Sequence, residues 1–396
     1  MPRTTYDIVI VGGGVMGWSA AFWLRRLGPQ GLRVAVVERD PGHAHSATAL
    51  SVASIRYQFS NAVNVRLSAF GMYFLNDFRS FIGVPDVPDR IHVQRNGYLF
   101  LAGTPEQDLI LRRNAEVQNA SGAQTLLLDR AALAARFGDL ALGDVTLGSF
   151  GAMGEGWFDN MALLNGLRAG ARAQGAAALT GSVVGITARD GAATLCLADG
   201  RALDCALIVN AAGPAAGAVT AMLGEKLPVE PRKRTVFVVD VPALRDSGLP
   251  LIVDHTGFYA RPEGRCWLCA EIPDPASDGA ADPTDFVPDH GAFERFLWER
   301  VAARLPGFET ARVLRDWAGH YDYNSLDQNA FVGMHPGRPE LWHLNGFSGH
   351  GLQHAPGAGR GLAELMLDGC FRSLDLTELS PERLVTGKAF RETAIV

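Results

Sequence analysis

The sequence predicts a mixed α/β fold, in which a domain built on a parallel sheet carries an inserted, mostly antiparallel sheet. Near each end of the chain, at residues 7–27 and 341–367, a short apolar run leads into a glycine-rich loop and then a helical pattern. Between them, residues 231–322 alternate between apolar and polar side chains, as expected of strands with one exposed face. With 396 residues the chain exceeds one simple core, so two domains are expected.

The first element is a strand–loop–helix unit with the spacing of a nucleotide-binding site. Residues 7–11 form an apolar run typical of a buried parallel strand, and they lead into the G-x-G-x-x-G sequence of residues 12–17. Gly12 permits a tight turn, Gly14 lets the backbone approach a pyrophosphate, and Gly17 allows close packing of helix and strand. The N-terminus of the helix offers free N–H groups and a positive dipole end to phosphates.

An acidic residue completes this unit. The next strand, residues 33–37, ends at Glu38, which lies 21 residues past Gly17 and can accept hydrogen bonds from a ribose diol. A glycine loop alone is equally compatible with an ordinary tight turn between a strand and a helix. Strand, loop, helix and acid in this order predict a Rossmann-like dinucleotide-binding domain.

The middle of the chain is less distinctive. A hairpin is expected from strands 179–188 and 193–197, joined by an Asp190-Gly191 turn. Residues 206–210 form a continuous apolar run that ends in the small-residue turn 211–214, which predicts another strand of the parallel sheet with backbone close to a ligand. The remaining patterns predict helices at 61–81, 105–120, 129–137, 160–174 and 291–304, and strands at 91–101 and 144–159.

The chain returns to nucleotide-domain character near its C-terminus. Residues 341–345 have a strand pattern, and the loop Gly346-Phe347-Ser348-Gly349-His350-Gly351 opens a helix that runs to residue 367. The nucleotide domain is therefore predicted to consist of three separated segments, and the inserted sheet domain of two. The predicted segments are 1–82, 150–228 and 325–396 for the first domain, and 83–149 and 229–324 for the second.

Composition argues against several classes of protein. A net charge of −6 and a pI near 5.9 argue against a nucleic-acid partner, which usually requires a basic face. No apolar stretch reaches the ~18 residues needed to cross a bilayer, so a membrane-spanning protein is not expected. The first strand begins within about six residues of the N-terminus and leaves no room for a signal peptide, so a cytoplasmic location is expected.

Cysteine and histidine spacings raise a metal or redox interpretation, which we do not favour. The C-x-x-C of Cys266 and Cys269 follows the turn 262–264 and has the pattern of a strand, where the two thiols would face opposite sides of the sheet. His350 and His354 have i, i+4 spacing, but His350 lies in a glycine-rich loop. No metal site is predicted.

Three features taken together resemble one flavoprotein family: the N-terminal glycine-rich unit, the turn 211–213 and the loop 346–351. Over nearly its whole length, the chain is similar to the D-amino-acid oxidase-like FAD-dependent oxidoreductases, which include sarcosine oxidase, glycine oxidase and dimethylglycine dehydrogenase. Within this family, residues 321–329 and 346–357 resemble the branch of the mitochondrial FAD-dependent oxidoreductase involved in respiratory complex I assembly.

The resemblance implies a bound FAD and assigns residues to both of its halves. Residues implied for the ADP half and the pyrophosphate are Gly12, Gly14, Gly17, Glu38, Arg39, Ser46, Thr48, Val183, Ala212 and Gly213. Residues implied along the isoalloxazine ring are Gly349, His350, Gly351, Leu352 and Gln353. Backbone amides of this second group, with the helix that begins there, would stabilise negative charge on reduced flavin.

The chain departs from its relatives at two points. Covalent members attach the flavin through a cysteine just before a tyrosine, whereas here the segment 317–321 reads Trp-Ala-Gly-His-Tyr, so the FAD is expected to be non-covalent. Sarcosine oxidases also place a lysine over the flavin to help oxygen react, but the lysines of this chain, Lys226, Lys233 and Lys388, lie outside the strands where it should sit. The electron acceptor is therefore either O2 or an unidentified redox partner.

Family substrates are amino acids or N-alkylamino acids, whose carboxylate requires a cation. A guanidinium holds a carboxylate through two parallel hydrogen bonds, so Arg56 and Arg261 are the candidate clamps, with surface or interdomain ion pairs as the alternative. Tyr259 and Tyr321 are candidates for the pocket wall, although aromatic residues in strands are more often core. Gln353 replaces the lysine that some sarcosine oxidases use for the carboxylate, which argues against plain sarcosine specificity.

The expected function is FAD-dependent oxidation of the C–N bond of a small secondary amine or amino acid. A hydride passes from carbon to flavin N5, and the resulting imine is hydrolysed. His350 and Gln353, beside the flavin, are the candidate catalytic residues, although an amine that binds deprotonated requires no acid–base group. The alternative is a flavoprotein that acts mainly in protein binding or assembly of a respiratory complex. An NAD-dependent dehydrogenase is disfavoured because it would leave the loop 346–351 unexplained.

Overall fold

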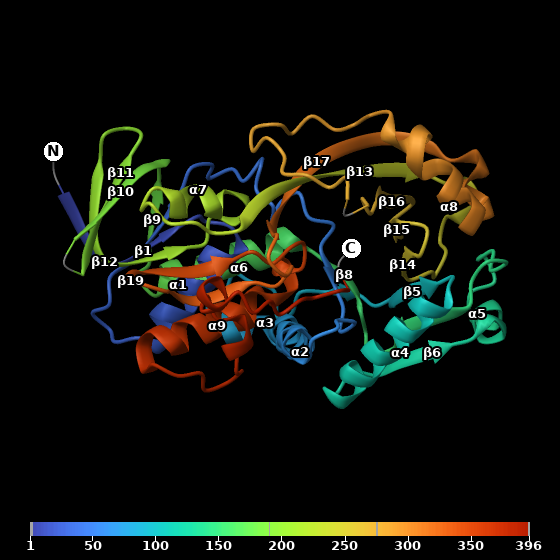
Figure 1. The fold of residues 1–396 in the computed structure, drawn as a ribbon, viewed down its shortest axis with the longest axis horizontal. Coiled ribbons are helices and arrows are strands. Elements are labelled where there is room, and N and C mark those ends of the chain that lie inside the picture. The colour runs from blue at the N-terminus through green and yellow to red at the C-terminus, as the bar shows by residue number, and fades with distance from the viewer. Residues whose placement is uncertain (1–2, 190, 275, 395–396) are drawn as a thin grey trace.

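Two large sheets form the two halves of the molecule, with long strands running between them (Figure 1). The structure is a computed structural model, and it describes residues 3–189, 191–274 and 276–394. A third, small sheet has three short strands. The mixed α/β architecture predicted from the sequence is confirmed.

The first sheet is the predicted parallel one. Its central strand β1 (Arg3–Val11) pairs in parallel with β2 (Val34–Glu38) on one side and β12 (Ala202–Asn210) on the other. Parallel pairing continues to β9 (Ala177–Thr180) beyond β2 and to β19 (Arg338–Asn345) beyond β12, and β18 (Phe331–His335) closes one end in antiparallel pairing. Because parallel strands share a carboxyl edge, the residues that follow β1, β2, β12 and β19 meet along one edge.

One element of the predicted hairpin is corrected. Leu179 belongs to β9, which pairs with β2, and the hairpin's own first strand is β10 (Val183–Arg189), paired with β11 (Ala192–Leu197). Two strands run together in the sequence pattern because the connection between them, Gly181 and Ser182, carries no strong break signal. Asp190 of the predicted turn lies outside the described residues.

Helices cover this sheet. The first, α1 (Val15–Leu27), is buried along most of its length and packs against α6 (Asn160–Ala173) and α9 (Gly351–Asp368). Small residues let α1 and α9 approach closely: the Ser19 hydroxyl donates to the Ala355 carbonyl over 2.6 Å, and a Cβ at Gly359 would stand 2.2 Å from the Ser19 Oγ. The two glycine-rich loops, far apart in sequence, are thereby held side by side.

The second sheet is mostly antiparallel, as predicted. Every adjacent pair is antiparallel except β14 with β5. Its long strands β13 and β17 pair along almost their whole length and reach toward the parallel sheet (Figure 1). The strand order is β17 (Arg312–Asn324), β13 (Val229–Asp240), β16 (Cys266–Glu271), β15 (Phe258–Glu263), β14 (Leu251–Asp254), β5 (Tyr98–Ala102), β7 (Leu147–Gly151) and β6 (Thr125–Leu128).

Several predicted elements are interrupted. The helix expected at 61–81 divides at Asp77 into α2 (Ala62–Asn76) and α3 (Phe78–Ile82). The strand expected at 91–101 divides at Gly97, whose φ of 92° no strand residue adopts, into β4 (Val93–Gln94) and β5. With β3 (Ser54–Ile55) and β8 (Gly156–Phe158), β4 forms the small third sheet, which the sequence did not predict.

Helices of the second half lie close to their predicted bounds. The pattern at 105–120 forms α4 (Pro105–Ala120) and that at 129–137 forms α5 (Arg130–Arg136). The helix expected at 291–304 begins as a π-helical turn, η3 (Phe293–Leu297), and continues as α8 (Trp298–Arg304). The remaining short elements are α7 (Ala216–Ala221), α10 (Arg383–Thr386), η1 (Gly213–Ala215), η2 (Pro242–Leu244), η4 (Pro306–Thr310) and η5 (Thr377–Leu379).

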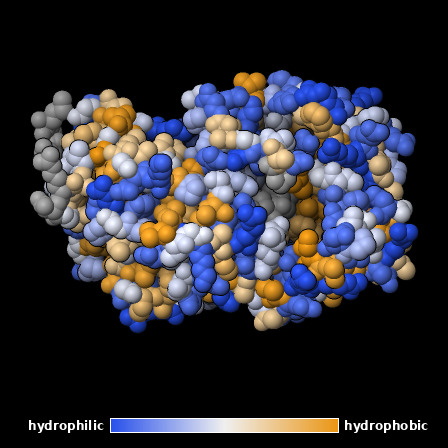
Figure 2. Space-filling view, in the orientation of Figure 1, coloured by the Kyte–Doolittle hydropathy of each residue, from blue (hydrophilic) through white to orange (hydrophobic). Residues whose placement is uncertain are grey.

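Polar residues cover much of the face seen in Figure 2, with apolar residues in separate patches among them. Over the described part of the chain, none of the helices combines the length and the apolar character that crossing a bilayer requires. The predicted domain boundaries stay a prediction.

Candidate cofactor and substrate site

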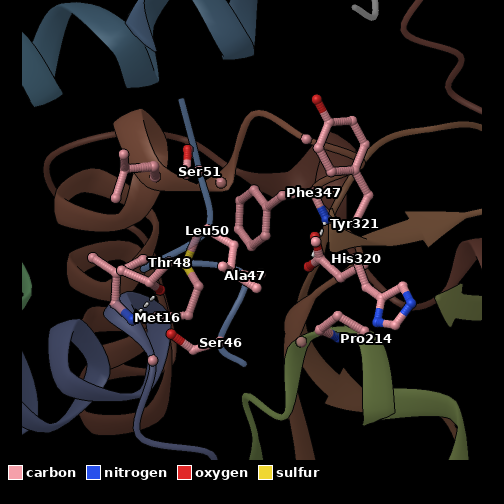
Figure 3. Close-up of a pocket in the computed structure, with 18 of the residues that line it drawn as sticks. Met16, Ser46, Ala47, Thr48, Leu50, Ser51, Pro214, His320, Tyr321 and Phe347 are labelled. Carbon is pink, nitrogen blue, oxygen red and sulfur yellow. Dashed lines mark hydrogen bonds between the residues drawn. The ribbon is translucent and has the colours of Figure 1, made fainter. Parts of the chain in front are cut away.

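One cavity runs from the carboxyl edge of the parallel sheet to the inner face of the antiparallel sheet. Figure 3 shows Ser46 and Thr48 on one side, His320 and Tyr321 on the other, and Phe347 between them. Most of the site residues predicted from the sequence line this cavity: Gly12, Gly14, Glu38, Arg39, Ser46, Thr48, Arg56, Ala212, Gly213, Tyr259, Tyr321, Gly349, His350, Gly351, Leu352 and Gln353.

The turn after β1 accepts only glycine at two positions. Gly12 has a φ of 103°, and a Cβ there would stand 2.4 Å from the carbonyl oxygen of Ala211, so the turn lies against the end of β12. A Cβ at Gly17 would stand 1.9 Å from the Gly12 carbonyl oxygen. Gly17 does not line the cavity; it lets α1 start directly against the turn, which aims the helix N-terminus at the cavity.

Glu38 is held in place by backbone amides. Its Oε2 accepts from the Gly13 N–H and its Oε1 from the Asp40 N–H, both over 2.7 Å. These two bonds fix the carboxylate at the cavity wall and leave further lone pairs on each oxygen. A ribose diol is the ligand group that such a fixed carboxylate recognises in dinucleotide sites.

The segment 46–51 is pinned to the start of α1. The Thr48 hydroxyl accepts from the Val15 N–H over 3.1 Å, and Asn160 of α6 donates to the Thr48 carbonyl over 2.7 Å. Ser46 accepts at its hydroxyl from the Ala49 N–H. Hydroxyl groups and helix amides therefore converge on the same part of the cavity, an arrangement suited to a pyrophosphate.

The second glycine loop is organised by Asp322 of β17. Its Oδ2 accepts from the N–H groups of Gly346 and Phe347 over 2.8 and 3.1 Å. Burial raises the pKa of this carboxyl to about 6, although those backbone hydrogen bonds oppose the rise. Gly349 has a φ of 94°, and a Cβ there would stand 2.4 Å from the Tyr321 ring, so the loop passes closely over that ring.

His350 carries the least satisfied polar atoms of the cavity wall. Its side chain is buried, and neither ring nitrogen has a hydrogen-bond partner among the described residues. Burial lowers its pKa well below the usual value, with smaller contributions from His354 and Arg56, so the ring is neutral. Buried polar atoms left without partners indicate that a ligand completes the site.

Arg56 is a buried cation that forms no direct ion pair with a carboxylate in the described chain. Its guanidinium donates to the backbone carbonyls of Gln58 and Ala394 and lies 4.1 Å from the centre of the Phe59 ring. Its own N–H donates to the Gln353 Oε1 over 2.8 Å. An arginine on a cavity wall with spare donors fits a carboxylate ligand.

Arg261 is placed differently. It does not line the cavity; it donates to Glu263 and to the Val52 carbonyl and lies 4.8 Å from the centre of the Trp157 ring. Arg261 therefore has the ion-pair role that the sequence left open as the alternative to a carboxylate clamp. Val183 is the third predicted site residue outside the cavity lining, since it lies in the bulged end of β10.

Several lining residues were not predicted, among them Arg234 and Phe286. Arg234 of β13 forms two hydrogen bonds with Asp278, of 2.8 and 2.7 Å, and its guanidinium lies 5.1 Å from the Tyr321 ring. Phe286 packs its ring against His45 at 4.5 Å and His320 at 4.6 Å. The run Arg232-Lys233-Arg234 inside a strand pattern was the available signal; Phe286 gave none, because it sits in a loop rich in proline and aspartate.

No lysine and no cysteine appears among the residues that line the described cavity. Lys233 instead pairs with Asp285 over 2.5 Å, and Lys226 and Lys388 are exposed. The described residues also contain no group of three or more side chains placed to hold a metal ion.

The residues present fit FAD. One end of the cavity offers a glycine turn, a helix N-terminus and a fixed carboxylate, and the other offers a second glycine loop, a second helix start and unpartnered polar atoms on His350. Such an arrangement suits a long ligand with a diphosphate at its centre.

Comparisons with known proteins agree. The model of the family described as "DAO: FAD dependent oxidoreductase" matches residues 7–365. The Xenopus laevis protein "FAD-dependent oxidoreductase domain-containing protein 1" is 39% identical, over 100% of this chain and 86% of its own length. The L-proline dehydrogenase of P. horikoshii is 25% identical with a TM-score of 0.84, over 98% of this chain and 100% of that one. The glycine oxidase of Geobacillus kaustophilus has the same fold, at 22% identity and a TM-score of 0.79, over 96% and 98%.

Proposed function

Because the chain belongs to the DAO family of FAD-dependent oxidoreductases, we propose that it oxidises the C–N bond of a small secondary amine or N-substituted amino acid. When bound, FAD would supply the acceptor for a hydride from the carbon next to nitrogen, which leaves an iminium that water hydrolyses to an amine, a carbonyl compound and a proton. The chain itself binds and orients the substrate and excludes bulk water.

The observation that carries this proposal is Arg56. A buried guanidinium that lines the cavity and forms no direct ion pair in the described chain provides the cation that an amino-acid carboxylate requires. The backbone N–H of Arg56 donates to the side chain of Gln353, which also lines the cavity. Gln353 belongs to α9, the helix that starts at the flavin end. A carboxylate held at Arg56 would therefore lie toward the end of the cavity where α9 begins, which is the end proposed for the flavin ring.

Neutral groups surround the rest of the substrate in this proposal. Burial raises the pKa of Tyr259 well above its usual value and also raises that of Tyr321, so both phenols stay protonated. His350 is neutral because its pKa is lowered. The other guanidinium beside Tyr321, that of Arg234, is paired with Asp278. Neutral groups around the unpaired Arg56 favour a substrate whose carboxylate is charged and whose amine is uncharged, which is the form that can lose a hydride.

Secondary amines fit the similarity to L-proline dehydrogenase, since proline is a cyclic secondary amine with a carboxylate. Cofactor roles follow the residues that line the cavity: Glu38 for the ribose, Ser46 and Thr48 for the pyrophosphate, and Gly349 to Gln353 for the flavin ring. The FAD is proposed to be non-covalent, because no cysteine lines the described cavity.

The electron acceptor is proposed to be a redox partner in preference to O2. Lysines, which help oxygen react with reduced flavin in sarcosine oxidases, do not line the described cavity. A lysine ammonium over the flavin stabilises the negative charge that develops as oxygen is reduced, so a cavity that no lysine lines is expected to react slowly with oxygen.

An anaerobic screen tests the proposal. Holoenzyme is mixed with N-methyl and N-carboxymethyl amino acids and with L-proline. The loss of the absorbance band of oxidised flavin, at about 450 nm, is recorded. Arg56→Ala is expected to weaken the apparent substrate affinity by about 10- to 100-fold, the loss of a charged hydrogen-bond pair. Arg261→Ala is the matched control, and equal losses in both variants would remove Arg56 as the specific clamp.

A further inference from the structure

A second buried charge lies behind Arg56. Glu155 belongs to the connection between β7 and β8, is 1% exposed, and does not line the cavity. Within the described chain its carboxylate forms no ion pair, and its hydrogen-bond partners, the Tyr57 N–H and the Gln58 side-chain amide, are neutral. A buried carboxylate without an ion-pair partner is costly, so its retention needs a physical explanation.

Two hydrogen bonds hold the Glu155 carboxylate next to the arginine's own segment. Its Oε1 accepts from the Tyr57 N–H over 2.8 Å, and its Oε2 accepts from the Gln58 Nε2 over 2.9 Å. Gln58 cannot turn away, because Ser149 donates to its Oε1 over 2.7 Å and its Nε2 also donates to the Tyr98 carbonyl over 2.8 Å.

The surrounding backbone leaves space for this carboxylate. A Cβ at Gly151 would stand between 1.9 and 2.4 Å from the carboxyl atoms of Glu155, so no other residue fits opposite it. The carboxylate is therefore fixed from both sides: hydrogen bonds on the side of residues 57 and 58, and close packing on the side of β7.

The electrostatic surroundings of Glu155 are simple. Burial raises its pKa to about 7, while Gln58, the Tyr57 amide and the positive charge of Arg56 pull it down. The tyrosines that face it, Tyr57 and Tyr98, both have pKa values raised by burial and do not titrate near neutral pH.

Histidines on the other side of Arg56 do not compete for a proton. Burial lowers the pKa of His354 to about 3 and that of His350 well below its usual value, and Arg56 lowers both further. Arg95 acts on Tyr57, and Arg261 on Tyr98, but neither contributes to the shift of Glu155. Of these buried groups near Arg56, Glu155 is the one whose pKa lies near neutral pH.

We propose that Glu155 is the internal counter-ion of Arg56, and that it takes up one proton from solvent when Arg56 binds a substrate carboxylate. This inference rests on the proposed function, because it requires Arg56 to bind a carboxylate. No covalent bond changes in the step: the incoming carboxylate replaces Glu155 as the partner of the guanidinium charge, and the proton neutralises the acid left behind. Glu155 is a positioning residue, since it acts on substrate through Arg56.

The sign of the coupling follows from linkage. In the free enzyme the charge of Arg56 lowers the pKa of Glu155, so binding of a carboxylate removes this effect and raises that pKa. Below about pH 7 Glu155 is protonated before and after binding, and affinity does not depend on pH. Above it, the dissociation constant rises by up to about tenfold per pH unit, until the pKa of the complex is reached.

The test uses holoenzyme and pyrrole-2-carboxylate, a secondary-amine carboxylate that has no hydride to lose. Binding is followed by the change in the flavin spectrum between about pH 6 and 9, and proton uptake by titration calorimetry in two buffers of different ionisation enthalpy. The wild-type enzyme is expected to take up close to one proton at pH 8. Glu155→Gln is expected to take up none, and to bind the probe about tenfold more tightly than wild type at pH 8.5.

Glu340→Gln is the matched control, because Glu340 is a buried carboxylate on β19 outside the cavity lining. It is expected to keep the wild-type pH profile and proton uptake. Probe binding to wild-type enzyme without proton uptake would overturn the role of Glu155 whether or not Glu155→Gln folds, and leave the carboxylate clamp intact. Absence of probe binding at every pH would overturn the clamp, and this inference with it.

Discussion

The backbone N–H of Arg56 donates to the side-chain Oε1 of Gln353 over 2.8 Å, although 297 positions separate the two residues. Arg56 follows the short strand β3, whereas Gln353 lies in the first turn of α9. The same oxygen lies 3.3 Å from the Ser68 hydroxyl of α2. One amide side chain therefore links the proposed carboxylate clamp to the helix that begins at the flavin end of the cavity.

Loss of this link is expected to affect both stability and substrate binding. Gln353→Ala leaves the buried Arg56 N–H without an acceptor, so we expect a loss of about 1–3 kcal/mol in the free energy of unfolding and weaker substrate binding. Denaturant unfolding and anaerobic substrate titration measure the two effects. Gln94→Ala, at an exposed position of β4, is the control and is expected to change neither. Unchanged stability in Gln353→Ala would contradict the link.

Close packing at the first glycine turn is expected to control cofactor binding. In Gly17→Ala, the new Cβ meets the Gly12 carbonyl oxygen at 1.9 Å, so turn and helix must move apart, at a cost of about 1–3 kcal/mol. We expect the purified variant to hold less FAD per chain than the wild type, measured by absorbance after denaturation. The control is Gly138→Ala, where a Cβ meets nothing within 4 Å. Equal FAD content in both variants would show that the turn is not the cofactor cradle.

Asp322 makes stability depend on pH. Its pKa is raised to about 6 in the folded chain from an ordinary value of 3.8, so the folded state binds the proton more tightly than the unfolded state. The associated stability is fully present below about pH 4 and is lost as the pH rises through about 6, with an order of magnitude of about 3 kcal/mol. Asp322→Asn is expected to reduce this dependence in denaturant unfolding by about 3 kcal/mol between those pH values, and to leave the part that comes from Glu155, whose pKa burial also raises. A pH dependence of the same size in the variant and the wild type would show that Asp322 does not contribute.

The choice of electron acceptor can be tested directly. Because no lysine lines the described cavity, we expect the substrate-reduced enzyme to pass electrons to an artificial acceptor such as dichlorophenolindophenol faster than to dissolved O2. Dye bleaching and oxygen consumption, measured with the same substrate, give the two rates. Oxygen consumption that matches or exceeds dye reduction would contradict the assignment as a dehydrogenase.

Sequence signals sufficed for the parts of the site that depend on local geometry. Gly12 and Glu38 could be predicted because a tight turn and a strand-end acid impose fixed spacings on neighbouring residues. The domain type also followed from the two glycine loops, since each needs a strand before it and a helix after it. The small third sheet escaped prediction because its strands are two or three residues long and pair across distant segments.

Residues that act through long-range packing could not be identified in this way. Arg234 forms an ion pair with Asp278, and the Phe286 ring packs against His45 and His320. None of these partners is close in sequence to the residue that it contacts. Glu155 could not be identified from the sequence, because its proposed role depends on the charge of Arg56. Arg56 lies about a hundred residues earlier and comes close to Glu155 only in the folded chain. Arg261 has the residue type expected of a carboxylate clamp, but its side chain lies outside the cavity lining. There it donates hydrogen bonds to Glu263 and to the Val52 carbonyl.

If the chain removes a hydride from the carbon next to an amine nitrogen, an amine and the matching hydroxy acid must differ in their effect on the flavin. Holoenzyme is mixed anaerobically with an N-methyl amino acid and, separately, with the 2-hydroxy acid of the same side chain, while the flavin absorbance is followed. We expect the amine to bleach the flavin in a single exponential phase and the hydroxy acid to leave it oxidised. Bleaching by the hydroxy acid alone, or by neither compound across the amine panel, would rule out amine oxidation, and the second result would favour a role in protein assembly.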